Sequence, residues 1–173
     1  LLGLGFLWLA SGIYVVQADE QGVVLRFGKY HTTTLPGLHY HLPWPVETVY
    51  TPSVTNVNQV EIGSDSAGGN VWETGSLMLT GDLNIVDVNF AVQWKIDSAG
   101  TDKFLFNIRD AEYIVRPVAE SAMREVIGQM PLDTILTTGQ TEIGTRSMTI
   151  MQKVLKEYDA GIQIIAVNLS KPD

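Results

Sequence analysis

The chain has 173 residues, which is enough for one full domain or two small ones, and 45% of them are hydrophobic, which is ample for a buried core. Its formal net charge is −8, from 11 basic and 19 acidic residues, so it lacks the basic surface that binds phosphate backbones. Nucleic acid is therefore not an expected partner. The absence of cysteine excludes disulfide bonds, thiol nucleophiles and thiolate metal sites.

An uncharged apolar run occupies residues 1–18. As a helix it would be about 27 Å long, which approaches the thickness of the hydrocarbon core of a membrane. The run therefore predicts a transmembrane helix that anchors the chain in a lipid bilayer. A secretory signal peptide is the alternative, but the run has no preceding Met or basic residue and is longer than a typical signal-peptide core. The side chains expected to anchor the helix are Leu4, Phe6, Leu7, Trp8, Leu9, Ile13 and Tyr14.

The charges after this run favour one orientation in the membrane. Asp19 and Glu20 follow the run directly, and no Lys or Arg occurs before Arg26. By the positive-inside rule, the folded part is expected on the outer side of the membrane. In a Gram-negative cell the chain would be a single-pass protein of the bacterial inner membrane, with its folded domain on the periplasmic side.

Short alternating runs, broken by Gly and Pro, begin at Gln21 and predict strands and turns. Pro43 and Pro45 fit an edge or an extended connection. The polar, glycine-rich residues 63–70 are expected to form a hairpin or a surface loop. The strands are expected within residues 22–29, 38–42, 54–62 and 71–79.

The clearest periodicity lies in residues 84–96, where apolar and polar side chains alternate, and it predicts one long strand with a buried face. The residues expected on that face are Val86, Val88, Phe90, Val92, Trp94 and Ile96. Helical periodicity follows over residues 111–130, and Pro117 is expected in the first turn of the regular helix. A second helix is expected over residues 142–158, with Gly161 as its C-terminal cap. A final strand after Gly161 completes an α+β fold.

No motif in the chain indicates catalysis or a cofactor. His39 and His41 share one strand face, but no third ligand accompanies them in the sequence, so a metal site is not expected. The chain has no nucleophile elbow, and its glycines do not have the spacing of a phosphate-binding loop. We therefore expect no catalytic, cofactor-binding or metal-binding residue and no enzymatic activity. A membrane-bound hydrolase and a lipid-binding module that uses Phe6, Trp8 and residues 36–46 stay open as alternatives.

Several longer blocks carry a resemblance to a known family. In chain order they are VQADEQGVVLRFGKY, PGLHYHLPWPVETV, MLTGDLNIVDVNFAVQWKI, FLFNIRDAE, AESAMREVIGQMPLDTILT and YDAGIQIIAVNL. The chain resembles the SPFH or band-7 family, named after stomatin, prohibitin, flotillin and HflK/HflC, and is most similar to its HflK-like members. Because the blocks run through nearly the whole chain in the family's order, they are more specific than any one short motif. One departure is Leu83, which stands where the family commonly has an acidic residue.

The resemblance implies an N-terminal membrane anchor, two small α+β subdomains and a long coiled coil. On this basis we expect a transmembrane helix over 1–18 and a first SPFH subdomain, made mainly of strands, over 19–80. The second subdomain, over 81–173, would combine the long strand, the helices and the final strand. The chain is expected to stop just before the coiled coil.

The resemblance also implies a non-catalytic membrane scaffold without a cofactor. HflK-like proteins assemble with an HflC-like protein into a large ring or dome, a hetero-oligomer that regulates the membrane AAA protease FtsH. The alternative is a stomatin- or prohibitin-like organiser of membrane microdomains that has no protease partner. Arginine and exposed tryptophan are enriched at protein interfaces. The candidate subunit contacts are therefore Arg26, Trp44, Arg109, Arg116, Arg124 and Arg146.

Overall fold

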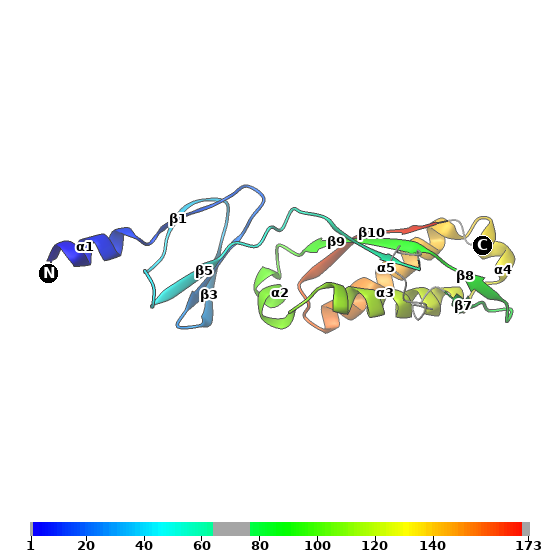
Figure 1. The fold of residues 1–173 in the computed structure, drawn as a ribbon. Helices are drawn as coiled ribbons and strands as arrows, with labels where there is room; N and C mark the ends of the chain where they lie inside the picture. The colour runs from blue at the N-terminus through cyan, green and yellow to red at the C-terminus, as the bar shows by residue number, and fades with distance from the viewer. Residues whose placement is uncertain (1, 64–76, 171–173) are drawn as a thin grey trace, which may run out of the picture.

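The computed structural model describes residues 2–63 and 77–170. The elements follow one another along an elongated molecule (Figure 1). Helix α1 (Leu2–Ala10) lies at one end, a small β unit follows it, and a larger α+β unit forms the other end.

Helix α1 is shorter than predicted. The helix expected over residues 1–18 ends at Ala10, and Ile13–Val16 form strand β1, which pairs antiparallel with β4 (Gly37–Tyr40). The chain turns at Gly12, where a Cβ would overlap the backbone just beyond β4. The β-branched and aromatic residues after this turn favour a strand, because they pack well on a pleated surface. No helix in the described ranges is long and apolar enough to cross a membrane.

A three-stranded antiparallel sheet in the order β3–β2–β5 forms the centre of the β unit. Its strands are β2 (Gly22–Arg26), β3 (Lys29–Thr34) and β5 (Glu47–Tyr50). Phe27 and Gly28 form the β2–β3 turn, and their φ angles of 49° and 80° match a two-residue hairpin turn with two left-handed residues. The buried apolar side chains described in this unit are Val16, Val23 and Val24. Because this core is small, polar contacts contribute much of the unit's order.

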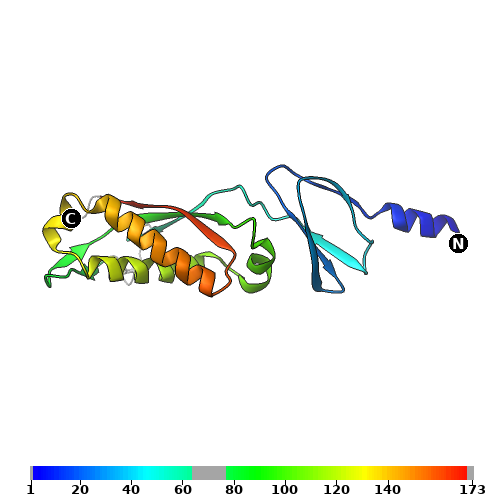
Figure 2. The same cartoon turned by 180° about the vertical axis from the view of Figure 1, so that it is seen from behind.

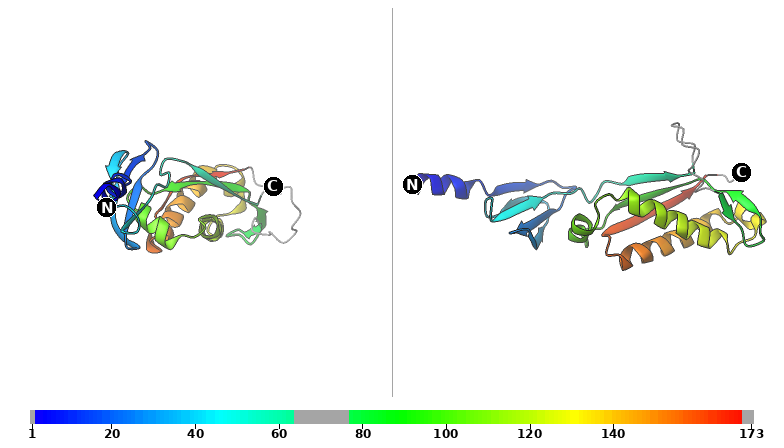
Figure 3. Two further views of the ribbon diagram at one scale, coloured as in Figure 1. Left: turned by 60° about the vertical axis from the view of Figure 1, so that its left-hand side comes forward. Right: turned by 60° about the horizontal axis from the view of Figure 1, so that its bottom comes forward.

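The larger unit contains a second three-stranded antiparallel sheet, in the order β10–β9–β6. Strand β9 (Phe90–Ile96) lies between β10 (Ile162–Leu169) and β6 (Asn58–Ile62). Helices α3 (Glu112–Ile127) and α5 (Gln140–Glu157) lie side by side on one face of this sheet (Figure 2 and Figure 3). The remaining elements are α2 (Thr101–Asn107), α4 (Leu132–Leu136) and the hairpin of β7 (Leu77–Leu79) and β8 (Ile85–Asp87).

The predicted long strand over residues 84–96 is divided in two. Strand β8 pairs with β7, whereas β9 pairs with β6 and β10, so the two parts belong to different sheets. The predicted buried face is nevertheless confirmed, because all six of its side chains are 7% exposed or less. They form one core with the inner sides of α3 and α5.

Helix α3 begins earlier than predicted. It starts at Glu112, and Pro117 lies inside it. Oδ1 of Asp110 accepts a hydrogen bond from the N–H of Glu112 at 3.1 Å, which stabilises this earlier start. Pro117 has no N–H to donate to the carbonyl of Tyr113, so the helix loses one hydrogen bond close to its start.

Three further predictions agree with the structure. The second predicted helix corresponds to α5, and the final strand corresponds to β10. Gly161 lies in the turn between them, with a left-handed φ of 62°. Beyond Gly63, the expected loop at 63–70 lies outside the described residues. Most of the strand expected at 71–79 also lies outside the described residues, and its last three residues form β7.

Strand pairing also bears on the domain boundary. Strand β6 precedes residue 80 but belongs to the sheet of the larger unit. We therefore propose that the boundary between the two subdomains lies between Ser53 and Asn58 instead of at residue 80. A buried hydrogen bond joins the units near this point, since Oγ1 of Thr101 donates to Oε1 of Gln21 at 2.6 Å.

Candidate functional site

One end of the molecule exposes large apolar side chains. On α1, Leu4, Phe6 and Leu7 are each 70% exposed or more, and Trp8 and Leu9 are nearly half exposed. Exposed apolar surface of this kind is unfavourable in water, and contiguous patches of it mark sites that meet a protein or a membrane.

Helix α1 is tied to the β unit by two hydrogen bonds. Nε1 of Trp8 donates to the carbonyl oxygen of Trp44 at 3.1 Å, and the hydroxyl of Tyr40 donates to the carbonyl oxygen of Leu9 at 3.0 Å. Trp44 is itself 77% exposed, so its loop extends the apolar surface of α1. We refer to α1, Trp44 and the neighbouring Phe27 as the apolar end.

The β2–β3 turn brings Phe27 to this end, since the N–H of Phe27 donates to the carbonyl oxygen of Val46 at 2.9 Å. Phe27 is 74% exposed, although a positive φ is unfavourable for an aromatic residue. Arg26 and Lys29 flank it, and they are the only Lys or Arg residues in 1–94. Aromatic and basic side chains together suit the boundary between hydrocarbon and anionic headgroups.

Glu47 is a carboxylate buried beneath this end, with its side chain 5% exposed. Its Oε1 accepts a hydrogen bond from Nε of Arg26 at 2.8 Å, and its Oε2 accepts one from the N–H of Leu42 at 2.8 Å. Burial raises the pKa of Glu47, but the hydrogen bonds from Leu42 and Arg26 and the charge of Arg26 outweigh burial, so the pKa lies below its ordinary value. Glu47 thereby fixes the turn that carries Phe27 and the loop that carries Trp44.

The predicted anchor residues do not all lie on one helix. Leu4, Phe6, Leu7, Trp8 and Leu9 are on α1, whereas Ile13 and Tyr14 are on β1. The hydroxyl of Tyr14 lies 2.9 Å from Oγ1 of Thr34, so Tyr14 packs within the β unit.

His39 and His41 share a face as predicted, because both rings contact the ring of Tyr14, at centroid distances of 5.8 and 5.3 Å. Each histidine also bonds to a nearby backbone carbonyl, that of Leu35 or Leu42. In residues 2–63 and 77–170, no group of three or more His, Asp or Glu side chains could hold a metal ion.

The predicted subunit-contact residues are spread over the molecule. They are Arg26 and Trp44 at the apolar end, and Arg109, Arg116, Arg124 and Arg146 on the larger unit. Arg116 and Arg146 pair with carboxylates one turn earlier on their own helices, at 2.8 and 3.6 Å. Arg109 and Arg124 are exposed and form no ion pair within the part of the chain that the structure describes. Arg109 and Arg124 are therefore the two arginines with charge available for a partner.

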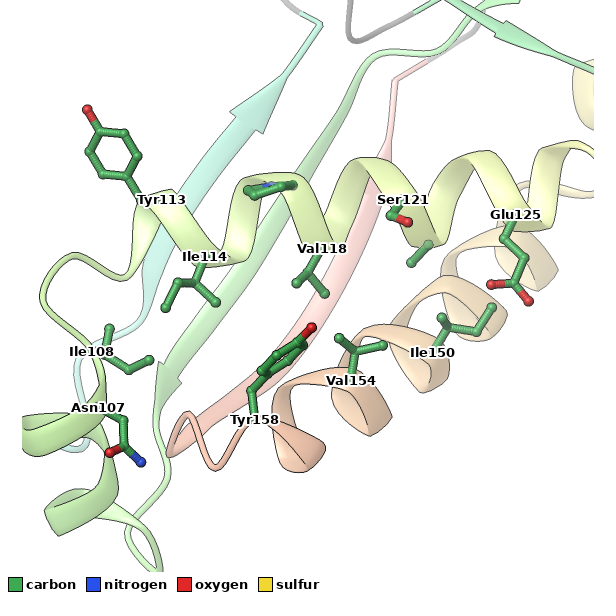
Figure 4. A pocket seen from close by; sticks show the side chains of 12 residues that line it. Asn107, Ile108, Tyr113, Ile114, Val118, Ser121, Glu125, Ile150, Val154 and Tyr158 are labelled. Atoms are coloured by element: carbon green, nitrogen blue, oxygen red, sulfur yellow. The ribbon is translucent and has the colours of Figure 1, made fainter.

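The larger unit also has a groove that was not predicted from the sequence. It lies between α3 and α5, opens to solvent and has a volume of about 570 Å³ (Figure 4). Its apolar floor and its exposed tyrosines are Ile114, Val118, Ile150, Val154, Tyr113 and Tyr158. The signal that could have found it is the width of the apolar stripe on α3, where Ile114 and Val118 lie beside the fully buried Val115 and Ala119.

Comparison with known proteins identifies the family. The sequence matches the SPFH domain / Band 7 family over residues 14–173. The chain belongs to this family. It is 35% identical to "Protein HflK" of Treponema pallidum over 98% of this chain and 53% of the relative. It is 33% identical to "Protein HflK" of Haemophilus influenzae and 32% identical to "Modulator of FtsH protease HflK" of Escherichia coli, in each case over 94% of this chain but only 36% and 35% of the relative.

These matches confirm the resemblance to the HflK-like members of the SPFH family and the mixed α+β fold that it implies. The family is one of non-catalytic scaffold proteins, so the chain is not an enzyme. The chain spans between about a third and a half of the length of these curated relatives.

Proposed function

We propose that the chain is the membrane-proximal part of a scaffold that regulates an FtsH-like membrane protease. The observation that carries this proposal is the similarity, over 94% of the chain, to a relative named as a modulator of FtsH protease. The apolar end supports the membrane part of the proposal, because five large side chains of α1 are exposed and none of them belongs to the hydrophobic core of the described residues.

In this proposal the apolar end faces a lipid bilayer. The apolar side chains of α1 enter the hydrocarbon, while Phe27 and Trp44 lie at the level of the headgroups with Arg26 and Lys29 beside them. The protein is a single-pass protein of the bacterial inner membrane, and the acidic residues after α1 favour a periplasmic position for the folded part.

The scaffold assembles with an HflC-like partner into a large ring or dome. Head-to-tail contacts close into a ring when the rotation between neighbours allows it, and such a ring encloses a patch of membrane. Arg109 and Arg124 support this role, because they are exposed and their charges are not balanced by ion pairs in the described residues.

The test is co-purification of the full-length protein in mild detergent, followed by size determination and mass spectrometry of the proteins that accompany it. We expect a very large assembly that contains an HflC-like chain and an FtsH-like protease. A small homo-oligomer that contains neither would contradict the proposal. It would favour the second candidate, a stomatin- or prohibitin-like organiser of membrane microdomains, which the family match supports equally well.

A further inference from the structure

The connection between the β unit and the larger unit has little packing of its own. Residues 55–57 are exposed and belong to no helix or strand. Among the described elements, no helix or strand of one unit packs extensively against an element of the other. Relative motion is the ordinary expectation for two units that are joined in this way. A fixed orientation of the two units must therefore come from a few contacts at the joint.

One buried hydrogen bond crosses this joint. The hydroxyl of Thr101, at the start of α2, donates to Oε1 of Gln21 at 2.6 Å. Thr101 is 1% exposed and Gln21 is 8% exposed, so little water competes for the bond. A buried acceptor that loses its donor is unfavourable, because neither water nor protein then satisfies it. The bond therefore opposes separation of the two units.

Gln21 and the beginning of the connection form one local structure. The N–H of Gln21 donates to the carbonyl oxygen of Pro52 at 3.1 Å, and the N–H of Val54 donates to that of Asp19 at 2.9 Å. The side chain of Val54 is partly buried and packs against the core of the larger unit. Gln21 and Val54 thus bring the β unit into contact with the larger unit at two neighbouring points.

The hydroxyl of Thr101 also has a second acceptor, which lies within the larger unit. Its Oγ1 is 3.2 Å from the carbonyl oxygen of Asp97. A hydroxyl has one proton and donates to one acceptor at a time, and the shorter contact is the one to Gln21. If Gln21 moves away, the hydroxyl can turn to Asp97. Opening of the joint then leaves only Gln21 to be hydrated, which lowers the free energy that opening requires.

We propose that Gln21 and Thr101 form a latch that holds the two units in one orientation, and that the latch opens when the hydroxyl of Thr101 turns to Asp97. With the latch closed, the chain moves as one body. With the latch open, the units swing about residues 55–57. Because the apolar end and the larger unit lie at opposite ends of the molecule, the latch decides whether the position of one sets that of the other (Figure 1). The inference concerns the conformation of the chain and does not depend on a membrane or protease partner.

Distances between spin labels on the two units test the latch. The chain has no cysteine, so Thr32→Cys and Thr149→Cys, at exposed positions of β3 and α5, place one nitroxide on each unit. Double electron–electron resonance measures the distribution of their distances in the full chain held in lipid nanodiscs. A second pair, Asp133→Cys and Gln163→Cys, lies within the larger unit and is the control for local disturbance. Circular dichroism checks that each variant folds.

We expect one narrow distribution of inter-unit distances for the unaltered chain and for Thr101→Ser, which keeps the hydroxyl. Thr101→Val and Gln21→Ala remove the donor and the acceptor, and each should widen this distribution by about twofold or more. The control pair should keep its width throughout. Thr145→Val removes a similar hydroxyl bond on the surface of α5, to the carbonyl oxygen of Thr141 at 2.9 Å, and should not widen the inter-unit distribution.

The opening step has its own test. In the Gln21→Ala chain the hydroxyl of Thr101 is expected to donate to Asp97, so adding Thr101→Val should still lower the midpoint temperature of unfolding. If it has no further effect, the hydroxyl does not turn to Asp97 and the opening step is wrong.

Two outcomes of the distance measurement would overturn the latch itself. One is a broad inter-unit distribution in the unaltered chain, which would mean that the units are not held. The other is a distribution that stays narrow in folded Thr101→Val and Gln21→Ala, which would assign the fixed orientation to other contacts.

Discussion

Arg26 and Glu47 face each other across the pairing of β2 and β5 and form an ion pair of 2.7 Å. The same carboxylate also accepts the N–H of Leu42, so one side chain connects two strands and the loop that follows β4. Glu47 is 5% exposed while Arg26 is 45% exposed, so water can solvate the arginine but not the carboxylate. Of the two partners, the carboxylate is therefore the one whose removal should lower the stability of the fold.

Glu47→Gln should destabilise the β unit and change how its stability depends on pH. Because the pKa of Glu47 is lowered in the folded state, its contribution to stability is present above the ordinary value of 4.5 and is lost as the pH falls through the folded pKa. Glu47→Gln should lower the free energy of unfolding by about 1–3 kcal/mol at neutral pH and remove this part of the acid sensitivity. Urea unfolding between pH 3 and pH 7 measures both effects.

The matched control is Glu112→Gln, which breaks an arginine pair of similar length on the surface of α3. Glu112 is 59% exposed, so its loss should cost less than about 1 kcal/mol. Equal effects of the two substitutions would show that burial of Glu47 is not the reason for its contribution.

Leu83 occupies a backbone conformation that suits a different residue. It lies in the β7–β8 turn with a φ of 65° and is 78% exposed. Asn tolerates a left-handed conformation better than Leu, so Leu83→Asn should raise the free energy of unfolding by about 1 kcal/mol. Leu77→Asn, at a half-exposed position of β7, should not raise the free energy of unfolding. Denaturant titration compares the two, and an equal gain at both positions would contradict the backbone explanation.

Gly161 and Gly28 differ in why their positions require glycine. Both have positive φ angles, 62° and 80°, but a Cβ at Gly28 meets no atom within 4 Å, whereas one at Gly161 would overlap the backbone of Gly100. Gly28→Ala should therefore cost only the conformational strain, about 1 kcal/mol. Gly161→Ala should cost clearly more, because α2 must also move away from the end of α5. Thermal unfolding of both variants provides the comparison, and a similar loss at the two sites would contradict the close approach.

The features that the sequence predicted correctly depend on local periodicity. Alternation over residues 84–96 identified the buried face, but the division into β8 and β9 depends on pairing with distant strands. The run at 1–18 was interpreted as one helix because apolar composition does not distinguish a helix from a strand, and Ile13–Val16 become a strand only through their pairing with β4. The α3/α5 groove is created by the relative position of two helices, which the periodicity of either helix does not contain.

Phe27 combines an unfavourable backbone conformation with an exposed aromatic ring, and we expect stability and membrane contact to oppose each other there. Asn before Gly is the preferred pair in a turn of this type. In detergent, Phe27→Asn should therefore raise the free energy of unfolding by about 1 kcal/mol, or the midpoint temperature by roughly 2–4 °C. Leu35→Asn is the control, because Leu35 is 69% exposed beyond the opposite end of β3.

Reconstitution of the full chain in anionic vesicles should reverse the order of stability. Any surface that binds only the folded protein stabilises it, so vesicles should raise the midpoint temperature of the unaltered chain more than that of Phe27→Asn. The gain should shrink at high salt, since Arg26 and Lys29 contribute electrostatically. If vesicles stabilise Phe27→Asn as much as the unaltered chain, the ring of Phe27 does not meet the bilayer, and its strained position must be explained by contact with a protein instead.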